Sequence, residues 1–407
     1  MINIESTISP KNIIVRPGYD YAPSVMQDTD GIYKAWWCAG VAGDFIGYGE
    51  SDSINSQFEI ISSNFFANRS NGQLEAEISF KTFDGIHACD PSVIKISDKY
   101  YLYYGGLANH TEKKTIDDRQ IRITDYPQAN SIATTHIGVA ISNDGINWQR
   151  QNNGNPILKP KADPTNINSY ASHKSIYGAG QPSAVYLNDK YYLVYHDSTG
   201  KGSNSMNGAG IYALSSSDPL FKNNVSELRC RGDEQQKIAA GSCTEAYWKS
   251  LEAHEQPSTK YAIAEAFSPA LAYSDSIKGF VLATHHQKGE SKLAFFNSQF
   301  ESITQKLNMP GGYWRDGPGL LTNAQGHIID NKSSIFTCQS FDINIFSGNS
   351  TTEEAKSWDI ARWGGTVNNC GSSIWSNLNL YIFVSLILII PFLTFCLRLL
   401  KDRRNRS

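Results

Sequence analysis

The sequence predicts an all-β protein: a five-bladed β-propeller with loop and helical inserts, followed by one C-terminal transmembrane helix. Three observations support this fold class: a composition rich in aromatic residues and poor in charge, a strand template that recurs five times, and one long apolar segment near the end. We therefore expect residues 1–350 to form the propeller, 351–376 a linker, 377–398 the membrane helix and 399–407 a basic tail.

The composition is typical of a β-rich protein. Aromatic residues make up 12% of the 407 residues and there are 32 glycines, whereas only 18% of residues are charged, against about 25% in an ordinary soluble domain. The 36 basic and 39 acidic residues leave a net charge of −3, which excludes a polybasic nucleic-acid binder. An apolar fraction of 40% also excludes a wholly disordered chain.

The repeat is a small or polar residue, a proline, a short apolar strand, a turn and an aromatic strand. Examples are CDPSVIKISDKYYLYYGG from Cys89 and GQPSAVYLNDKYYLVYHD from Gly180. A third strand follows in most units, and such units repeated five times predict a propeller; two stacked β-sandwiches would not reproduce the template. The anchoring prolines are Pro23, Pro91, Pro182, Pro269 and Pro318.

Two long polar inserts, Asn109–Thr135 and Leu228–Ala264, interrupt the repeat. The second contains TEAYWKSLEAHEQ, whose pattern is partly helical. We expect both inserts to overhang the channel as walls or a lid.

The phrases ACDPSVIKISDKYYLYYGG, IGVAISNDGINWQRQNNGNPIL and GAGQPSAVYLNDKYYLVYHD resemble the five-bladed β-propeller glycoside hydrolases, which include families 43, 32, 62 and 68. The resemblance covers roughly Ile14–Phe346 and implies hydrolysis of a glycosidic bond in a poly- or oligosaccharide. Resemblance to family 43 implies three carboxylates at the ends of the innermost strands. One Asp-Pro pair would supply the base, a second would supply an Asp that tunes the pKa of the acid, and the Glu of a Glu-Gly-Pro segment would be the acid.

Of these three carboxylates, the sequence retains Asp90. Ala22 stands in the position of the base, and Gly180-Gln181 in that of Glu-Gly. Asp20 lies two residues before Ala22, so in an extended strand it would point to the same side, about 6.6 Å away. The candidate catalytic residues are Asp90, Asp20, Glu265 and Asp316. Each could instead cap backbone N–H groups in a turn.

Sugar binding would use rings that stack on a sugar and polar groups that grip its hydroxyls. Packing in the blade cores is the alternative for the aromatic residues. The candidates are Arg16, Trp36, Tyr104, Gln181, Asp197, His285, Trp314 and Arg315. No cofactor and no metal ligand is expected, although the resemblance allows a structural calcium ion on the propeller axis. Trp148, in SNDGINW, is expected to be structural.

The segment Leu378–Leu397 contains 20 residues without a charge, enough for a helix to cross a bilayer of about 30 Å. A tail of net charge +4 follows it, which predicts a single-pass membrane protein with a cytoplasmic tail and an extracytoplasmic propeller. The first residues, MINIESTISPKNIIV, lack the apolar region of a secretory signal, so either the true start lies elsewhere or the domain is cytosolic. In an oxidising compartment, Cys230 and Cys243 are close enough in sequence to form a disulfide.

Our leading hypothesis from the sequence is a membrane-tethered glycosidase. The rival hypothesis is a non-catalytic carbohydrate-binding propeller, because two of the three expected acids are missing. A protein-binding propeller of the WD-repeat kind is disfavoured, since no Gly-His or Trp-Asp signature recurs.

Overall fold

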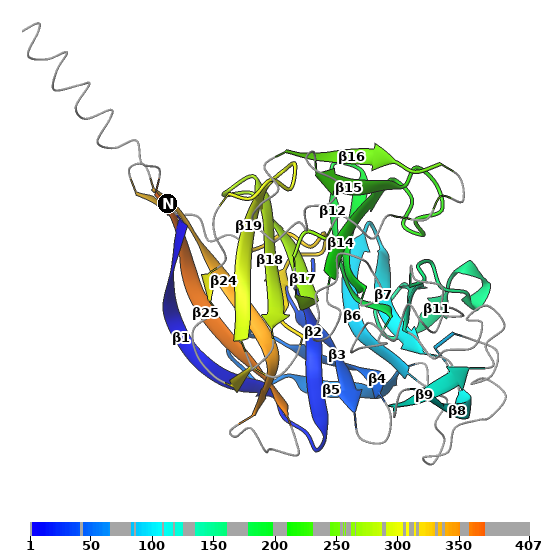
Figure 1. Cartoon of the computed structure of the whole chain (residues 1–407). Helices are drawn as coiled ribbons and strands as arrows, with labels where there is room; N and C mark the ends of the chain where they lie inside the picture. The colour runs from blue at the N-terminus through cyan, green and yellow to red at the C-terminus, as the bar shows by residue number, and fades with distance from the viewer. Residues whose placement is uncertain are drawn as a thin grey trace, which may run out of the picture.

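The structure is a computed structural model in which nearly every described residue belongs to a β-strand or a turn (Figure 1). One short 3-10 turn, Asn152–Gly154, is the helical element within the described residues. The described residues are 2–40, 44–65, 83–84, 87–107, 110–116, 119–124, 135–160, 178–197, 210–230, 245–252, 255, 257, 262–264, 266–286, 290–303, 307–308, 313–314, 317–329, 333–335, 338–350 and 358–370.

The first two blades are antiparallel meanders whose strands follow the chain from the inside outwards. The strands of blade 1 are β2 (Tyr19–Gln27), β3 (Tyr33–Gly40), β4 (Asp44–Ser51) and β5 (Glu59–Phe65). Those of blade 2 are β6 (His87–Ile96), β7 (Lys99–Leu107), β10 (His136–Ser142) and β11 (Trp148–Arg150). A separate hairpin, β8 (His110–Ile116) and β9 (Arg119–Thr124), lies within the first predicted insert.

Blades 3 and 4 repeat the same arrangement. The strands of blade 3 are β12 (Ala179–Leu187), β13 (Lys190–Asp197), β14 (Gly210–Ser216), β15 (Ser226–Cys230) and β16 (Ala246–Ser250). Those of blade 4 are β17 (Phe267–Ser274), β18 (Gly279–His286), β19 (Glu290–Asn297) and β20 (Leu307–Asn308).

Blade 5 joins the two ends of the described chain. Its strands run from the inside outwards as β22 (Gly319–Thr322), β24 (Cys338–Ser350), β25 (Asp359–Cys370) and β1 (Ile2–Ile14), with β21 (Tyr313–Trp314) and β23 (Ser333–Ile335) also pairing with β24. Figure 1 shows β1 lying along β25 at the outer edge. Because β1 covers the edge of β25, the N-terminal strand closes the ring on its last blade.

The innermost strands form a closed ring, which is the five-bladed propeller arrangement that the repeat predicts. Each of β2, β6, β12 and β17 contacts the next inner strand, β17 contacts β22, and β22 pairs in parallel with β2. The close approach of β22 to β2 requires glycine: a Cβ on Gly319 would lie 1.9 Å from the carbonyl oxygen of Pro23, and one on Gly317 only 2.4 Å from the Cα of Ala22.

The serine after the proline links neighbouring blades. The hydroxyls of Ser24, Ser92 and Ser183 each accept a hydrogen bond, of 2.8–3.0 Å, from a backbone N–H of the following inner strand. The donors are Val93, Ala184 and Leu271. The serine of the template therefore accepts hydrogen bonds from backbone N–H groups that have no acceptor in the strand pairing of their own blade.

Replacing Ser183 by Ala should lower the free energy of unfolding by about 1–3 kcal/mol, because the buried N–H of Leu271 would lose its acceptor. Urea unfolding measures this effect. The matched control is Ser298→Ala at an exposed turn position, where a change below about 0.5 kcal/mol is expected. Equal effects of the two substitutions would contradict this role of the serine.

One end of the channel is closed by the turn after β22, at Asn323–Ile328. Successive carbonyls of this turn, those of Ala324, Gln325 and Gly326, accept hydrogen bonds of 2.6–3.1 Å from backbone N–H groups of three other blades. The donors are Lys95, Tyr186 and Tyr273. The segment NAQG forms a tight turn that brings Thr322 and Ile328 together in an antiparallel bridge, but the strand that pairs along β22 is the distant β24.

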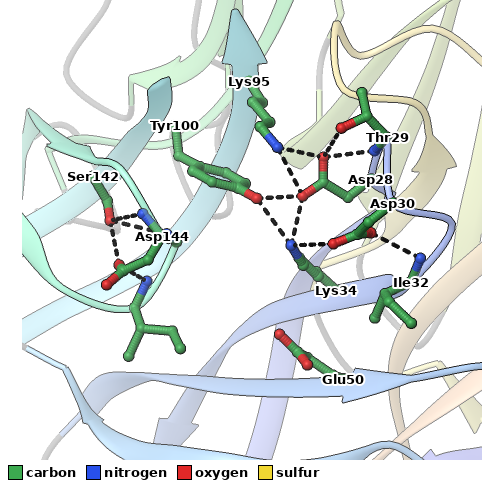
Figure 2. A network of polar contacts seen from close by, with 12 residues as sticks. Asp28, Thr29, Asp30, Ile32, Lys34, Glu50, Lys95, Tyr100, Ser142 and Asp144 are labelled. Atoms are coloured by element: carbon green, nitrogen blue, oxygen red, sulfur yellow. Dashed lines mark hydrogen bonds and ion pairs between the residues drawn. The ribbon is translucent and has the colours of Figure 1, made fainter. Parts of the chain in front are cut away.

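A buried charge network joins blades 1 and 2 at this closed end (Figure 2). The carboxylate of Asp28 accepts hydrogen bonds from the ammonium groups of Lys34 at 2.6 Å and Lys95 at 2.8 Å, and from the hydroxyl of Tyr100. Although burial alone would raise the pKa of Asp28, these donors together hold it well below its usual range. With Asp30, whose Oδ2 lies 3.2 Å from Nζ of Lys34, the network pairs two carboxylates with two ammonium groups, which indicates a structural link between the blades.

Two sequence predictions about the ends and inserts need correction. Strand β25 lies within the segment 351–376 predicted as a linker, because its Gly- and Asn-rich sequence pairs along most of β24 and β1. The predicted helical pattern in the second insert is wrong at Ala246–Ser250, which forms strand β16 against β15. Within the described ranges, no helix is long and apolar enough to cross a membrane; the predicted span 377–398 lies outside them.

Candidate functional site

Five equivalent residues, each directly before an anchoring proline, face the channel from the five inner strands. All five have a left-handed backbone, with φ between 47° and 58°; this conformation costs about 1–3 kcal/mol at each of the four positions that are not glycine. In four blades this kink coincides with a slip in the register between the first two strands. The ring consists of Ala22, Asp90, Gln181, Ser268 and Gly317, all lining one cavity.

Asp90 is the ring residue that carries a charge. It is 5% exposed, and its Oδ2 lies 3.4 Å from the point that a Cβ on Gly105 would occupy. At that separation a Cβ would be in ordinary van der Waals contact with Oδ2, so the carboxylate packs directly beside β7. Among the described residues that line the cavity, Asp90 is the single acidic one.

Gln181 is fixed by the neighbouring blade. Its Oε1 accepts a hydrogen bond of 2.8 Å from the backbone N–H of Ser268, and lies 3.1 Å from Nδ1 of His196. Because an amide oxygen only accepts, we assign the imidazole proton to Nδ1. Burial lowers the pKa of His196 to about 3, so this imidazole is neutral at physiological pH. Asp197, the next residue along β13, is fully buried.

Asp20 lies behind the channel wall, at the junction of blades 1 and 5. Its side chain is fully buried, Oδ1 accepts a hydrogen bond of 2.9 Å from Nε1 of Trp37, and Nε of Arg16 lies 3.6 Å from the same oxygen. Burial raises the pKa of Asp20 to about 7, while Arg16 and Trp37 lower it and the charge of Asp359 raises it further. This carboxyl therefore keeps its proton to a much higher pH than an ordinary aspartic acid does.

The predicted alignment of Asp20 with Ala22 does not hold. The left-handed backbone at Ala22 and the register slip between Tyr21 and Ser24 interrupt the alternation of side chains along β2. Ala22 turns into the channel, whereas Asp20 packs outward against Trp37.

Two of the aromatic candidates for sugar binding lie in the core between blades 1 and 2. Trp36 is fully buried and donates a hydrogen bond of 2.8 Å from Nε1 to the carbonyl of Gly145. Tyr104 is also fully buried, and its hydroxyl donates to Oδ2 of Asp84 at 2.8 Å. Trp148 donates to the same carbonyl of Gly145 as Trp36 does, as expected of a structural residue in that turn.

The remaining predicted residues are only partly described. His285 is 4% exposed and packs edge-to-face on Phe267, with ring centroids 4.9 Å apart. Trp314 belongs to β21. Glu265, Asp316 and Arg315 lie outside the described residues, as does Cys243 of the predicted Cys230–Cys243 disulfide.

A disulfide that the sequence analysis missed links Cys38 of β3 to Cys89 of β6. It joins blades 1 and 2 directly beside Asp90, and the hydroxyl of Tyr21 lies 3.7 Å from Sγ of Cys89. The disulfide and the kink at Asp90 together fix the position of this carboxylate at the channel mouth.

An aromatic cluster at the same end was also missed. The ring of Trp358 contacts those of Tyr19 and Tyr21 edge-to-face, with centroids 5.0 and 6.1 Å apart. Its backbone pairs with β2 through hydrogen bonds to Gly18 and Asp20. The Tyr-Asp-Tyr sequence directly before Ala22 is a signal that could have directed attention to the two tyrosines.

The channel itself is too narrow for a sugar. Its free volume is about 40 Å³, room for a few water molecules, and its far end is closed by the Asn323–Ile328 turn. A saccharide that contacts Asp90 would therefore have to bind at the mouth of the channel and not inside it. A calcium ion on the axis would find one carboxylate in the described ring, which does not fit the several carboxylate and carbonyl oxygens that calcium prefers. No group of three metal-ligating side chains is found in the described part of the chain.

Comparison with known proteins gives structural neighbours alone. No protein-family model and no curated protein matches the chain. Similar solved structures include a family 117 glycoside hydrolase of Zobellia galactanivorans, with 12% identity over 89% of this chain and 90% of that one and a TM-score of 0.47. A GH43_1 enzyme of Xanthomonas citri has 10% identity over 87% and 90%, with a TM-score of 0.46. An N-acetylgalactosamine deacetylase of F. plautii has 13% identity over 89% and 92%, with a TM-score of 0.45. Similarity at this level concerns the general arrangement of strands and leaves the chemistry to the residues.

Proposed function

We propose that this protein hydrolyses a glycosidic bond in a poly- or oligosaccharide bound across the mouth of the channel. One observation carries the proposal: two buried carboxyl groups, Asp20 and Asp90, lie at the mouth ends of neighbouring inner strands, and burial raises the pKa of Asp20 to about 7. Glycosidases need such a pair, with one carboxyl protonated to act as the acid.

In this proposal Asp20 is the acid, and because its carboxyl is buried behind the channel wall, its side chain turns toward the mouth to donate the proton to the leaving oxygen. Its Oδ1 is occupied by Trp37, whereas its Oδ2 is buried without a hydrogen-bond partner among the described residues, so Oδ2 would carry the transferable proton. Asp90 would supply the negative charge that activates water or tunes the acid. Glu265 and Asp316 remain candidates for the third carboxylate.

Replacing Asp90 by Asn is expected to lower glycan hydrolysis at least about 100-fold while leaving the fold intact. The test follows reducing-end release from a panel of plant and microbial polysaccharides, with Asp98→Asn, at an exposed turn, as the matched control. Hydrolysis at the wild-type rate by the Asp90→Asn variant would contradict the proposal.

A non-catalytic carbohydrate-binding propeller is the second candidate function. Ala22 and Gly180 stand where the resemblance implies a base and an acid, and Asp90 is the single carboxylate on the described channel wall. If the wild type binds a glycan in calorimetry without releasing any reducing ends, and Asp90→Asn weakens that binding, this second function replaces the first.

We also propose that the domain is tethered to a membrane by residues 377–398 and works outside the cytoplasm. The Cys38–Cys89 disulfide supports an oxidising compartment. Protease protection of the domain in sealed vesicles of known orientation tests this location, and digestion from the cytoplasmic side would contradict it.

A further inference from the structure

We infer that the aromatic cluster Tyr19–Tyr21–Trp358 is a second sugar-binding subsite, which holds a glycan unit beside the one at the channel mouth. The inference rests on the proposed function and adds to it a ligand of at least two or three sugar units. The glycan would extend from the channel mouth over the junction of blades 1 and 5.

The first support is exposure. Tyr19 is 40% exposed, more than any other Phe, Trp or Tyr side chain in the described part of the chain. Tyr21 and Trp358 are partly exposed. Trp36 and Trp37, on the neighbouring strand β3, are in contrast fully buried. A grouped exposed aromatic surface on a folded domain commonly marks a binding site.

The second support is the geometry of the rings. The planes of Tyr19 and Trp358 meet at 81°, and those of Tyr21 and Trp358 at 71°. In an edge-to-face pair, the ring that presents its edge keeps both of its faces clear of its partner. Flat aromatic faces pack well on the apolar C–H face of a sugar ring, whereas tyrosine hydroxyls can bond its polar rim.

The third support is continuity with the mouth. Tyr21 directly precedes Ala22 of the channel ring, and its hydroxyl lies 3.7 Å from Sγ of Cys89, the residue before Asp90. The cluster and the carboxylate therefore lie on strands that the Cys38–Cys89 disulfide links. The backbone of Trp358 is hydrogen-bonded to Gly18 and Asp20, so truncating its side chain leaves these backbone contacts in place.

The experiment measures affinity by calorimetry for cello-, xylo- and arabino-oligosaccharides of one to six units, using the full chain. For the series that binds best, Trp358→Ala and Tyr19→Ala should each weaken binding of ligands of three or more units about 10-fold and leave the monosaccharide unchanged. The control is Tyr186→Ala, at the closed end of the channel, which should change neither. Thermal unfolding of all variants checks that they are folded, and Trp358→Phe should retain most of the affinity.

The possible outcomes separate this inference from the proposed function. If Asp90→Asn abolishes hydrolysis while Trp358→Ala and Tyr19→Ala bind long ligands as the wild type does, the subsite is wrong and the proposed function stands. If the wild type neither binds nor cleaves any member of the three series or of the polysaccharide panel, both are wrong. Equal weakening for all ligand lengths would also overturn the subsite, since it would indicate damage at the mouth itself.

Discussion

Replacing Asp20 by Asn is expected to stabilise the protein above pH 7 and to leave its stability unchanged near pH 4. The unfolded chain releases this proton near pH 4, whereas the folded protein retains it up to about pH 7. Between these values the folded state binds more protons, so the free energy of unfolding of the wild type falls as the pH rises. The fall amounts to at most about 4 kcal/mol, and an amide at position 20 avoids it.

Urea unfolding of the wild type and of the Asp20→Asn variant between pH 4 and pH 8.5 measures this difference. The variant should gain relative stability steadily with pH, whereas Asp98→Asn should follow the wild type throughout. Parallel curves for the wild type and Asp20→Asn would show that Asp20 is ionised well below pH 7 and would remove it as the acid. In the same variant, hydrolysis should fall at least about 100-fold, and wild-type activity should decline above pH 7 as the acid loses its proton.

The second large effect is expected from the Cys38–Cys89 disulfide. It links residues 51 positions apart, and the chain-entropy model gives such a cross-link about 4 kcal/mol. The double variant Cys38→Ser with Cys89→Ser should therefore unfold at markedly lower urea concentration. Because Cys89 adjoins Asp90, hydrolysis should also fall in the folded variant.

Reductant supplies the matched control for this prediction. It should lower the unfolding midpoint of the wild type to nearly that of the double variant and add little to the variant itself. Any effect of reductant on the unfolding midpoint of the double variant would come from other cysteines. A wild-type midpoint that reductant leaves unchanged, with the bond shown to be reduced by thiol titration, would contradict the expected contribution.

The sequence predicted the fold well because its repeat has a local physical cause. Each proline follows a residue with a left-handed backbone that faces the channel. In blades 1 and 2, the serine after the proline accepts a hydrogen bond from the next blade. The same short sequence motif therefore recurs along the chain. Blade 5 was predicted less well. Its second strand lies beyond the turn that closes the channel, and its outer strands come from a segment read as a linker and from the N-terminus.

The site was predicted only in part, because its members are assembled by tertiary contacts. Asp90 and Gln181 could be predicted because both belong to the repeated sequence motif and directly precede its proline. Trp358 reaches Tyr19 from the far end of the sequence. The adjacent Trp36 and Trp37 illustrate another difficulty: alternation along β3 sends one into the core between blades 1 and 2 and the other into the core between blades 1 and 5. Composition alone could not distinguish such buried rings from exposed ones.

The most direct test of the central claim is a crystal structure of the Asp90→Asn variant with an oligosaccharide that the wild type cleaves. We predict a sugar ring across the channel mouth within hydrogen-bond distance of residue 90, with the Asp20 side chain turned toward the scissile oxygen and the next unit on Trp358. An oligosaccharide bound at any other part of the molecule, with the mouth empty, would contradict the account.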